Sequence, residues 1–269
     1  MSELNKKNIS VLGCGWLGMP LAKQLIKTGA YTISGSTTTS EKLKKIKDAG
    51  IQPFIIDLKK NIPPGFLTCD ILVITVPPSS GNYENRIKRL IGQIKTSNVR
   101  KVVFISTTSV YPNSGKIAVE SDAAYITSSH SGVTMLAIED MFRHEGSFGT
   151  TILRFAGLYG PERHPGRFLA AKRELSGAEN PVNLIHQEDC VNIILRIIED
   201  ECWGETFNAC ADEHPIRKVF YTKAAHHLGV GAPTFTDKAS GYKVISSEKL
   251  KRALGYTFLH ADPMEDLQR

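Results

Sequence analysis

The sequence has few cysteines and no paired cysteine motif. Five cysteines are spread over 269 residues, none forms a C-x-x-C pair, and no histidine cluster has zinc-ligand spacing. An odd number of cysteines without these motifs argues against a disulfide framework or a zinc site. We therefore expect free, mostly buried thiols in a reducing cytosol, and no metal.

Long hydrophobic runs are missing as well. The longest aliphatic run, residues 71–76, is far shorter than the roughly 20 residues that a membrane-spanning helix needs. Residues 1–7 are polar and charged, which is not the pattern of a signal peptide. We expect a soluble, cytoplasmic protein that makes no membrane contact.

The charge excess is small and carries no signature of nucleic-acid binding. Lys and Arg number 33 against 27 Asp and Glu, a formal net charge of +6. The densest basic stretch, residues 42–47, has no aromatic side chains interleaved for base stacking. This stretch is better interpreted as a solvated helix face near a phosphate-bearing ligand, and we expect no nucleic-acid partner.

Short aliphatic runs alternate with helical patterns over the first 155 residues. Hydrophobic residues make up 41% of the chain, enough for a sizeable core at this length. Candidate strands are residues 9–12, 31–35, 53–57, 71–76, 102–106 and 151–155. Apolar residues at helical spacing lie between them, and glycines at 29 and 50 are suited to end two of the helices. This alternation predicts an α/β fold with a doubly wound parallel (Rossmann) sheet.

A glycine-rich loop follows the first candidate strand and opens the first helix. Residues 13–18 read GCGWLG, which is the G-x-G-x-x-G spacing in its required context. Gly13 allows a tight turn, Gly15 lets a pyrophosphate approach bare backbone, and Gly18 lets the helix pack closely on the sheet. With the helix N-terminus providing amide donors, the loop predicts NAD(P) binding through Gly13, Gly15, Trp16, Leu17 and Gly18.

The end of the second strand indicates which dinucleotide is preferred. An NAD site needs a carboxylate about 20 residues after the loop for the ribose hydroxyl, but residues 35–40 read GSTTTS and the first acid is Glu41. Hydroxyls with Lys42 nearby favour the 2′-phosphate of NADP, although Thr39 or Ser40 could equally cap the next helix. The other predicted cofactor-binding residues are Ser36, Thr37, Thr38, Asp57, Leu58, Thr75 and Val76.

After residue 155 the pattern loosens. Residues 157–165 hold two glycines and two prolines and predict a loop. Helices are expected at residues 167–175, 189–198, 217–228 and 247–254, and strands at 182–185 and 206–209. We predict a dinucleotide-binding domain over residues 1–155, completed by elements in 182–210. A smaller C-terminal substrate lobe over 156–269 is predicted to form by insertions.

Five segments together resemble the extended short-chain dehydrogenase/reductase superfamily, which includes NAD-dependent epimerases and dehydratases. They are residues 13–18 (GCGWLG), 105–111 (ISTTSVY), 154–161 (RFAGLYGP), 183–189 (NLIHQED) and 207–208 (FN). The first of these narrows the resemblance to an atypical branch with a GCGWLG loop.

The resemblance implies a catalytic hydroxyl, tyrosine and lysine, and this sequence retains only the first. Thr107 aligns with the hydroxyl, which also contacts the cofactor. The family's tyrosine and lysine stand eight and four positions before an acidic residue, here Glu139, and those positions hold Ser131 and Met135. Tyr125 precedes this helix and is the one candidate for a substitute acid.

The resemblance also implies a substrate site after the sixth strand. Its predicted residues are Tyr111, Arg154, Tyr159, Arg163, His164 and Arg167. Arg154 could instead form a structural ion pair, Tyr111 could serve packing, and the charges at 163–167 could be ordinary solvated ones. His186 and Asp189 match an element that supports folding more often than catalysis.

Two functions fit these observations. The first is an NAD(P)-binding epimerase- or reductase-like protein that acts on, or recognises, a sugar-nucleotide-like or other anionic metabolite. Dehydratase chemistry is disfavoured, because Thr108 and Ser109 replace the acids of the resembled dehydratases. The second is a non-catalytic dinucleotide sensor that has lost the Tyr-x-x-x-Lys pair. Either protein would be a monomer or a homodimer with a small-molecule ligand.

Overall fold

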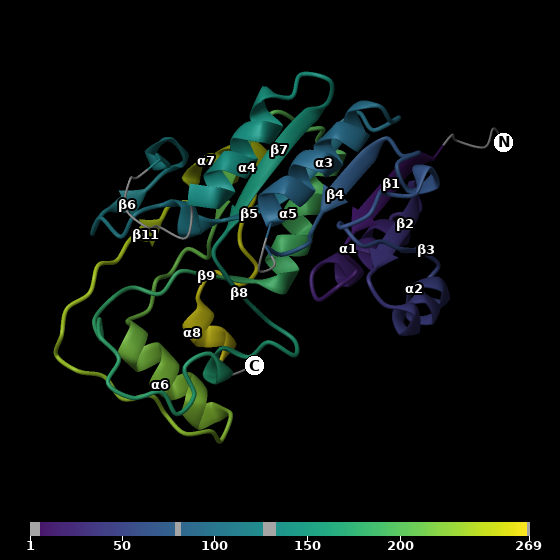
Figure 1. The fold of residues 1–269 in the computed structure, drawn as a ribbon. Helices are drawn as coiled ribbons and strands as arrows, with labels where there is room; N and C mark the ends of the chain where they lie inside the picture. Colours follow the sequence, from purple (N-terminus) through teal and green to yellow (C-terminus); the bar gives the residue numbers. More distant parts are fainter. Residues whose placement is uncertain (1–5, 79–81, 126–132, 268–269) are drawn as a thin grey trace. The chain divides into compact units, whose positions relative to one another are not determined.

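A seven-stranded sheet organises the chain (Figure 1). The computed structural model describes residues 6–78, 82–125 and 133–267. The sheet strands are β1 (Lys7–Leu12), β2 (Tyr31–Thr37), β3 (Gln52–Ile55), β4 (Ile71–Ile74), β5 (Lys101–Thr107), β7 (Gly149–Phe155) and β10 (Thr206–Ala209). Their order is β10-β7-β5-β4-β1-β2-β3, and β3, β2, β1, β4 and β5 pair in parallel. This is the predicted doubly wound α/β fold.

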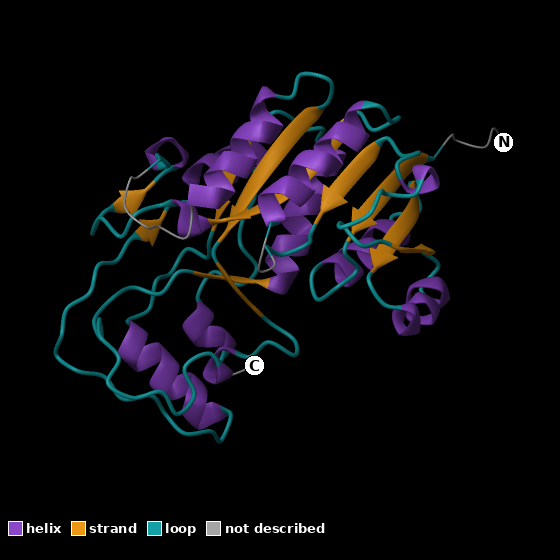
Figure 2. Cartoon of the chain, in the orientation of Figure 1, coloured by secondary structure: helices purple, strands orange, loops and turns teal. Residues whose placement is uncertain are grey.

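Helices connect most of these strands (Figure 2). They are α1 (Gly18–Lys27), α2 (Leu43–Asp48), α3 (Tyr83–Lys95), α4 (Val133–His144), α5 (Gln187–Glu199), α6 (Arg217–His227), α7 (Glu248–Leu254) and α8 (Pro263–Asp266). Because parallel strands need crossover connections, helices α1 to α4 fall between strands, where the apolar spacing of the sequence predicts them.

The chain divides into two compact units. Unit 1 comprises residues 1–106, 134–153 and 194–206, and unit 2 comprises 107–133, 154–193 and 207–269. In unit 1 every residue of β4 is buried, as expected for a central parallel strand. Helix α4 packs on β5 through Phe142, whose ring centroid lies 4.6 Å from that of Phe104.

Unit 2 contains two small parallel ribbons. One pairs β6 (Ile117–Ala118) with β11 (Val244–Ile245), and the other pairs β8 (Gly157–Tyr159) with β9 (Leu184–His186). The second ribbon shares an apolar cluster with α6 and the C-terminal segment, formed by Tyr159, Val182, Leu184, Phe220, Ala224 and Leu267.

The helix predicted over residues 167–175 is wrong. Only a 3-10 turn, Pro165–Arg167, forms there. Ala171 and Glu174 have positive φ angles of 56° and 54°, which interrupt any helix. The backbone of 171–177 instead bonds residues 231–238, as in Leu175 N–H to the Thr234 carbonyl. This pairing is 60 residues distant in sequence, so local spacing could not reveal it.

The cysteines agree with the prediction of free, mostly buried thiols. All five cysteines are free thiols, and four of them are buried. Burial raises the pKa of Cys14 to about 11, which makes it an unreactive core thiol.

Across the described ranges, no helix is both long enough and apolar enough to cross a membrane.

Asp189 fastens the C-terminal segment of unit 2 to the start of α5. Its carboxylate is fully buried and accepts hydrogen bonds from the Tyr256 hydroxyl at 2.7 Å, Leu259 N–H at 2.8 Å and His260 N–H at 3.1 Å. A buried carboxylate is tolerated when its oxygens are satisfied in this way. Asp189 is therefore a structural residue of unit 2.

Replacing this carboxylate should destabilise the protein strongly. Asp189→Ala leaves three partly buried donors without their acceptor, so we expect a loss of about 3 kcal/mol in the free energy of unfolding. Urea unfolding measures it. The exposed Asp237 provides the control, because Asp237→Ala should change stability by no more than about 0.5 kcal/mol. Similar losses for both variants would contradict the assignment.

Candidate functional site

The three glycines of the phosphate loop have three different surroundings. Gly13 has a φ of 103°, and a Cβ built there would lie 2.9 Å from Val76 Cγ1. A Cβ at Gly18 would lie 2.2 Å from the carbonyl oxygen of Gly13. At Gly15 a Cβ would meet no described atom within 4 Å. Gly13 thus forms the turn, Gly15 leaves room for a ligand, and Gly18 allows close packing of the helix. A pyrophosphate-binding loop requires these three roles.

Side chains from neighbouring strands hold this loop in place. The Thr75 hydroxyl donates to the Gly13 carbonyl at 2.7 Å, and the Ser36 hydroxyl accepts from Gly13 N–H at 2.9 Å. Cys14 N–H bonds the Ser36 carbonyl at 2.7 Å. Ser36 and Thr75, both predicted to bind the cofactor, therefore position the loop.

The first turn of α1 presents backbone rather than side chains. In the described structure its N-cap, Leu17, makes no side-chain capping bond, and the Leu17 side chain is buried. Trp16 is half-buried beside the exposed Gly15. Amide groups at a helix N-terminus carry a partial positive charge and bind phosphate. The loop therefore fits the pyrophosphate of a dinucleotide.

The end of β2 and the residues after it carry hydroxyl side chains, and the first carboxylate is that of Glu41. Thr37 is buried and its hydroxyl accepts from Thr39 N–H at 3.3 Å, whereas Thr38 is exposed. Thr39 N-caps the following 3-10 helix, Ser40–Lys42, without a side-chain bond. Thr39 therefore does not cap this helix through its hydroxyl. For Ser40 the structure is compatible with both predicted roles, helix capping and binding of a 2′-phosphate.

The remaining predicted cofactor residues lie after β3 and β4. The exposed Asp57 accepts from Lys59 N–H at 2.9 Å, and the Leu58 carbonyl accepts from the Arg89 guanidinium. The carbonyl of Val76, which is half-buried, accepts from the Tyr83 hydroxyl at 3.0 Å. Unit 1 thus contains all the predicted cofactor residues except Thr107.

The position that the resemblance assigns to lysine is filled by a buried apolar side chain. Met135 is 4% exposed on α4, one turn before the fully buried Glu139. Glu139 accepts from the Ser106 hydroxyl at 2.6 Å at the end of β5 and pairs with Arg143. Glu139, from which the tyrosine and lysine positions are counted, is therefore a structural residue. Ser131, assigned to the tyrosine position, lies outside the described residues.

Thr107 is the last residue of β5. Its hydroxyl accepts from Ser109 N–H at 3.2 Å and caps the 3-10 helix Thr108–Val110. A hydroxyl that accepts this bond still has its own hydrogen to donate. Tyr125, the candidate substitute acid, is 56% exposed.

Two predicted substrate residues lie in a buried network of unit 2. Tyr111 is completely buried, and its hydroxyl donates to Asn208 Oδ1 and accepts from Arg154, both at 2.6 Å. Arg154, 2% exposed, also donates to the Glu120 carbonyl at 3.0 Å. Burial raises the pKa of Tyr111 to about 12 although Arg154 opposes the shift. These contacts favour the structural alternative for both residues.

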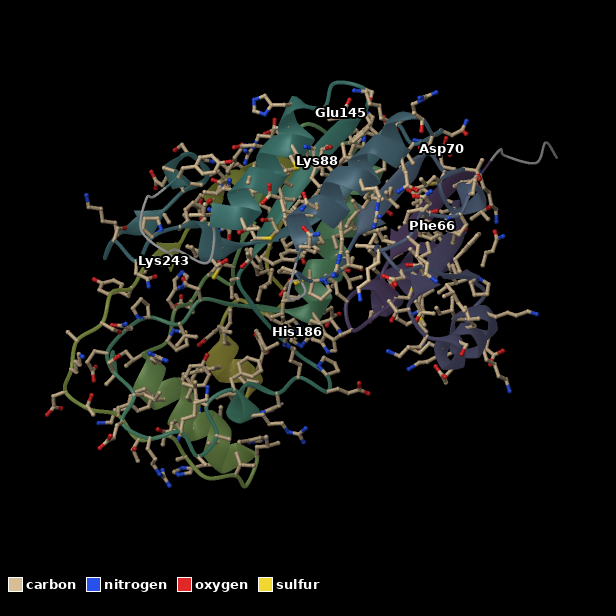
Figure 3. The ribbon with its side chains drawn as sticks, in the orientation of Figure 1. Phe66, Asp70, Lys88, Glu145, His186 and Lys243 are labelled. Atoms are coloured by element: carbon tan, nitrogen blue, oxygen red, sulfur yellow. The ribbon has the colours of Figure 1, made fainter. Side chains whose placement is uncertain are left out.

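Tyr159 is likewise part of the core. It is 3% exposed, and its hydroxyl donates to Asp266 on α8. Its ring meets that of His186 at 5.1 Å, and His186 (labelled in Figure 3) stacks on His260 at 3.6 Å. Two neighbouring strand ends and the C-terminal helix are joined here, so Tyr159 supports the fold of unit 2.

Three cationic residues predicted to bind substrate follow β8. Arg163 and Arg167 are exposed, and the half-buried His164 lies between them. The His164 ring accepts from Gly166 N–H at 3.0 Å and stacks on His227. Burial and the neighbouring His227 lower the pKa of His164, which is therefore mainly neutral at pH 7. The two guanidinium groups provide the lasting positive charge of this loop.

Comparisons with known proteins agree with this geometry. A family model described as the NAD dependent epimerase/dehydratase family matches residues 86–210. Protein YeeZ of Escherichia coli (strain K12) is 32% identical over 273 residues, covering 96% of this chain and 98% of that protein.

Two solved structures have the same fold at low sequence identity. One is a functionally unknown conserved protein from Silicibacter pomeroyi, with a TM-score of 0.81, 22% identity and 98% coverage of both chains. The other is a UDP-glucuronic acid 4-epimerase from Bacillus cereus in complex with UDP-glucuronic acid and NAD. It has a TM-score of 0.78 and 21% identity, covering 97% of this chain and 96% of that one.

The surroundings of the loop glycines predict opposite results for two alanine substitutions. Gly18→Ala places a methyl group against the Gly13 carbonyl and should lower the free energy of unfolding by about 3 kcal/mol. Gly15→Ala adds a methyl group in open space and should change it by no more than about 0.5 kcal/mol. Thermal unfolding of both variants measures this. A Gly18→Ala variant as stable as wild type would contradict the close packing of α1.

Proposed function

Because this chain belongs to the NAD-dependent epimerase/dehydratase family, we propose that it binds NAD(P) at the phosphate loop of unit 1. We further propose that it acts on, or recognises, a sugar-nucleotide-like or other anionic metabolite. The observation that carries the first proposal is the bare backbone at Gly15, beside an N-terminus of α1 whose N-cap residue, Leu17, makes no side-chain capping bond.

In this proposal the chain's own residues bind and orient the ligands. The amides of residues 16–18 hold the pyrophosphate, while Ser36 and Thr75 keep the loop in shape. The nicotinamide, when bound, accepts or donates a hydride. Thr107 donates its hydroxyl hydrogen to a substrate oxygen, and Tyr125 is the candidate proton donor.

The proposed substrate class is supported by charge and by the structural neighbours. The guanidinium groups of Arg163 and Arg167 are exposed in unit 2, where bidentate contacts to phosphate or carboxylate are available. The Bacillus cereus epimerase was solved with UDP-glucuronic acid, an anionic sugar nucleotide. We extend that ligand class to this chain.

A second candidate function is a dinucleotide sensor without turnover. The observation that favours it is the buried Met135, because a thioether cannot hold the ribose or lower the pKa of a neighbouring acid. A sensor would keep the phosphate loop, and Thr107 would serve ligand binding only. The two candidate functions share the cofactor site and differ in whether the protein turns over a substrate.

Cofactor binding should be lost when a carboxylate is placed in the loop. Gly15→Asp puts a side chain and a negative charge where the pyrophosphate approaches, so NADPH binding measured by calorimetry should disappear while the fold persists. Gly92→Asp, at an open helix position of unit 1, is the matched control and should bind as wild type does. NADPH binding by Gly15→Asp at wild-type affinity would refute the loop assignment.

NADPH should bind more tightly than NADH. We propose this preference because no carboxylate lies between residues 35 and 40, and because the exposed Lys42 follows two residues later, after Glu41. The expected margin is about 1–2 kcal/mol, the contribution of one charge-assisted phosphate contact. Lys42→Gln should reduce the margin and Lys47→Gln should not. Equal calorimetric affinities, or tighter NADH binding, would overturn the preference.

Wild-type protein should show negligible turnover of nicotinamide cofactor across a panel of sugar-nucleotide and carbonyl substrates. General acid–base assistance is worth about 10²–10⁴-fold, and Met135 provides no charge to tune an acid. The screen compares wild type with Tyr125→Phe and with the double variant Ser131→Tyr, Met135→Lys. Fast wild-type turnover that Tyr125→Phe abolishes would reject the sensor and identify Tyr125 as the acid. Fast turnover that Tyr125→Phe leaves unchanged would require an acid other than Tyr125.

A further inference from the structure

Lys243 carries a half-buried ammonium group in unit 2. Lys243, labelled in Figure 3, stands directly before β11, and its Nζ donates to the carbonyl oxygen of Tyr111 at 2.7 Å. Tyr111 ends the segment that begins at Thr107. The ammonium is therefore bonded to the backbone of the same segment that provides the proposed substrate-binding hydroxyl.

The backbone on both sides of Lys243 is fixed. Asn183 donates its amide to the Lys243 carbonyl at 2.9 Å and accepts from Ile245 N–H at 2.9 Å. Val244 N–H bonds the Lys116 carbonyl at 3.1 Å, and β11 then pairs with β6. A lysine held this way loses less freedom on binding a ligand than a lysine on an open loop.

The charge of Lys243 has no counter-charge within the described part of the chain. Its only hydrogen-bond partner there is the Tyr111 carbonyl, which uses one of three ammonium hydrogens. Lys251, in the same unit, lies instead between Asp212 and Glu248 at 2.9 and 2.8 Å. Burial lowers the pKa of Lys243, whereas hydrogen bonds to the two acids raise the pKa of Lys251.

A partly buried ammonium without an acid is costly, and a bound anion would offset that cost. The carbonyl partner is itself rigid, because Tyr111 is fully buried and its hydroxyl is fixed by Arg154 and Asn208. Lys243 thus combines a fixed position, two donors for a ligand and an unbalanced positive charge.

We propose that Lys243 is an anion-binding residue of unit 2 that contacts a carboxylate or phosphate group of the substrate. This inference rests on the proposed function, because it identifies a recognition group for the same anionic ligand. It adds a buried contact to the exposed guanidinium groups of Arg163 and Arg167. Sequence spacing does not reveal it, because Lys243 lies 132 residues from its partner Tyr111.

The test measures binding of UDP-glucuronic acid and UDP-glucose, which differ by one carboxylate. Lys243→Gln should weaken UDP-glucuronic acid binding by roughly 10-fold or more, the effect expected for a charge-assisted hydrogen bond. Weakening of both ligands assigns the contact to the diphosphate, and weakening of UDP-glucuronic acid alone assigns it to the carboxylate. Lys243→Arg, which keeps the charge, should recover most of the loss.

Lys238→Gln is the matched control, since Lys238 is an exposed lysine of the same segment. It should bind both ligands as wild type does, and unfolding temperatures should show that all three variants are folded. Wild-type affinity of Lys243→Gln for both ligands would overturn the proposal. A Lys243→Arg variant as weak as Lys243→Gln would overturn it too, because the role would then not be that of a positive charge.

A second measurement tests the anion site at Lys243 independently of whether the protein binds sugar nucleotides. Trinitrobenzenesulfonate modifies lysine amines, and peptide mass spectrometry reports the rates at Lys243 and Lys238. Pyrophosphate or glucuronate should slow the modification of Lys243 only. If wild type binds neither UDP-sugar but one anion protects Lys243, the substrate class fails and the anion site stands. If UDP-sugars bind but no anion protects Lys243, the proposal for Lys243 fails alone.

Discussion

The contact on which unit 1 depends is the approach of the first turn of α1 to the carbonyl of Gly13. That carbonyl lies 2.2 Å from where a Cβ of Gly18 would stand, and it also accepts the Thr75 hydroxyl at 2.7 Å. The helix and β4 are therefore joined through one backbone group of the loop. Since only glycine allows this approach, the helix N-terminus is held against the sheet while the backbone at Gly15 stays uncovered.

Unit 2 uses most of its polar core to hold itself together. Arg154 is bonded to Tyr111, Asp189 accepts from the Tyr256 hydroxyl, and Tyr159 is bonded to α8. Such networks fix a unique arrangement because a single missing partner leaves a costly orphan. In the proposed function, anion recognition is assigned to the arginines after β8 and to the ammonium of Lys243.

The sequence predicted what depends on neighbours along the chain. The phosphate loop, the strands of the seven-stranded sheet and α5, α6 and α7 follow from spacing and glycine positions within about 20 residues, whereas β6, β8 and β11 were not predicted. The roles of Arg154 and Tyr159 depend on Tyr111 and Asp266, which lie 43 and 107 residues away. The helix predicted at 167–175 failed for the same reason, because its backbone bonds are taken by residues 231–238. Motif resemblance located these residues but could not separate support of the fold from contact with a ligand.

The central claim is that the backbone of the loop binds the dinucleotide pyrophosphate. Hydrogen–deuterium exchange at single-amide resolution tests it directly, with and without saturating NADPH. The account predicts slower exchange at the amides of residues 16–18, and unchanged exchange in α6 of unit 2. Tight NADPH binding that leaves the loop amides unprotected, or that protects the basic stretch at 42–47 instead, would contradict it.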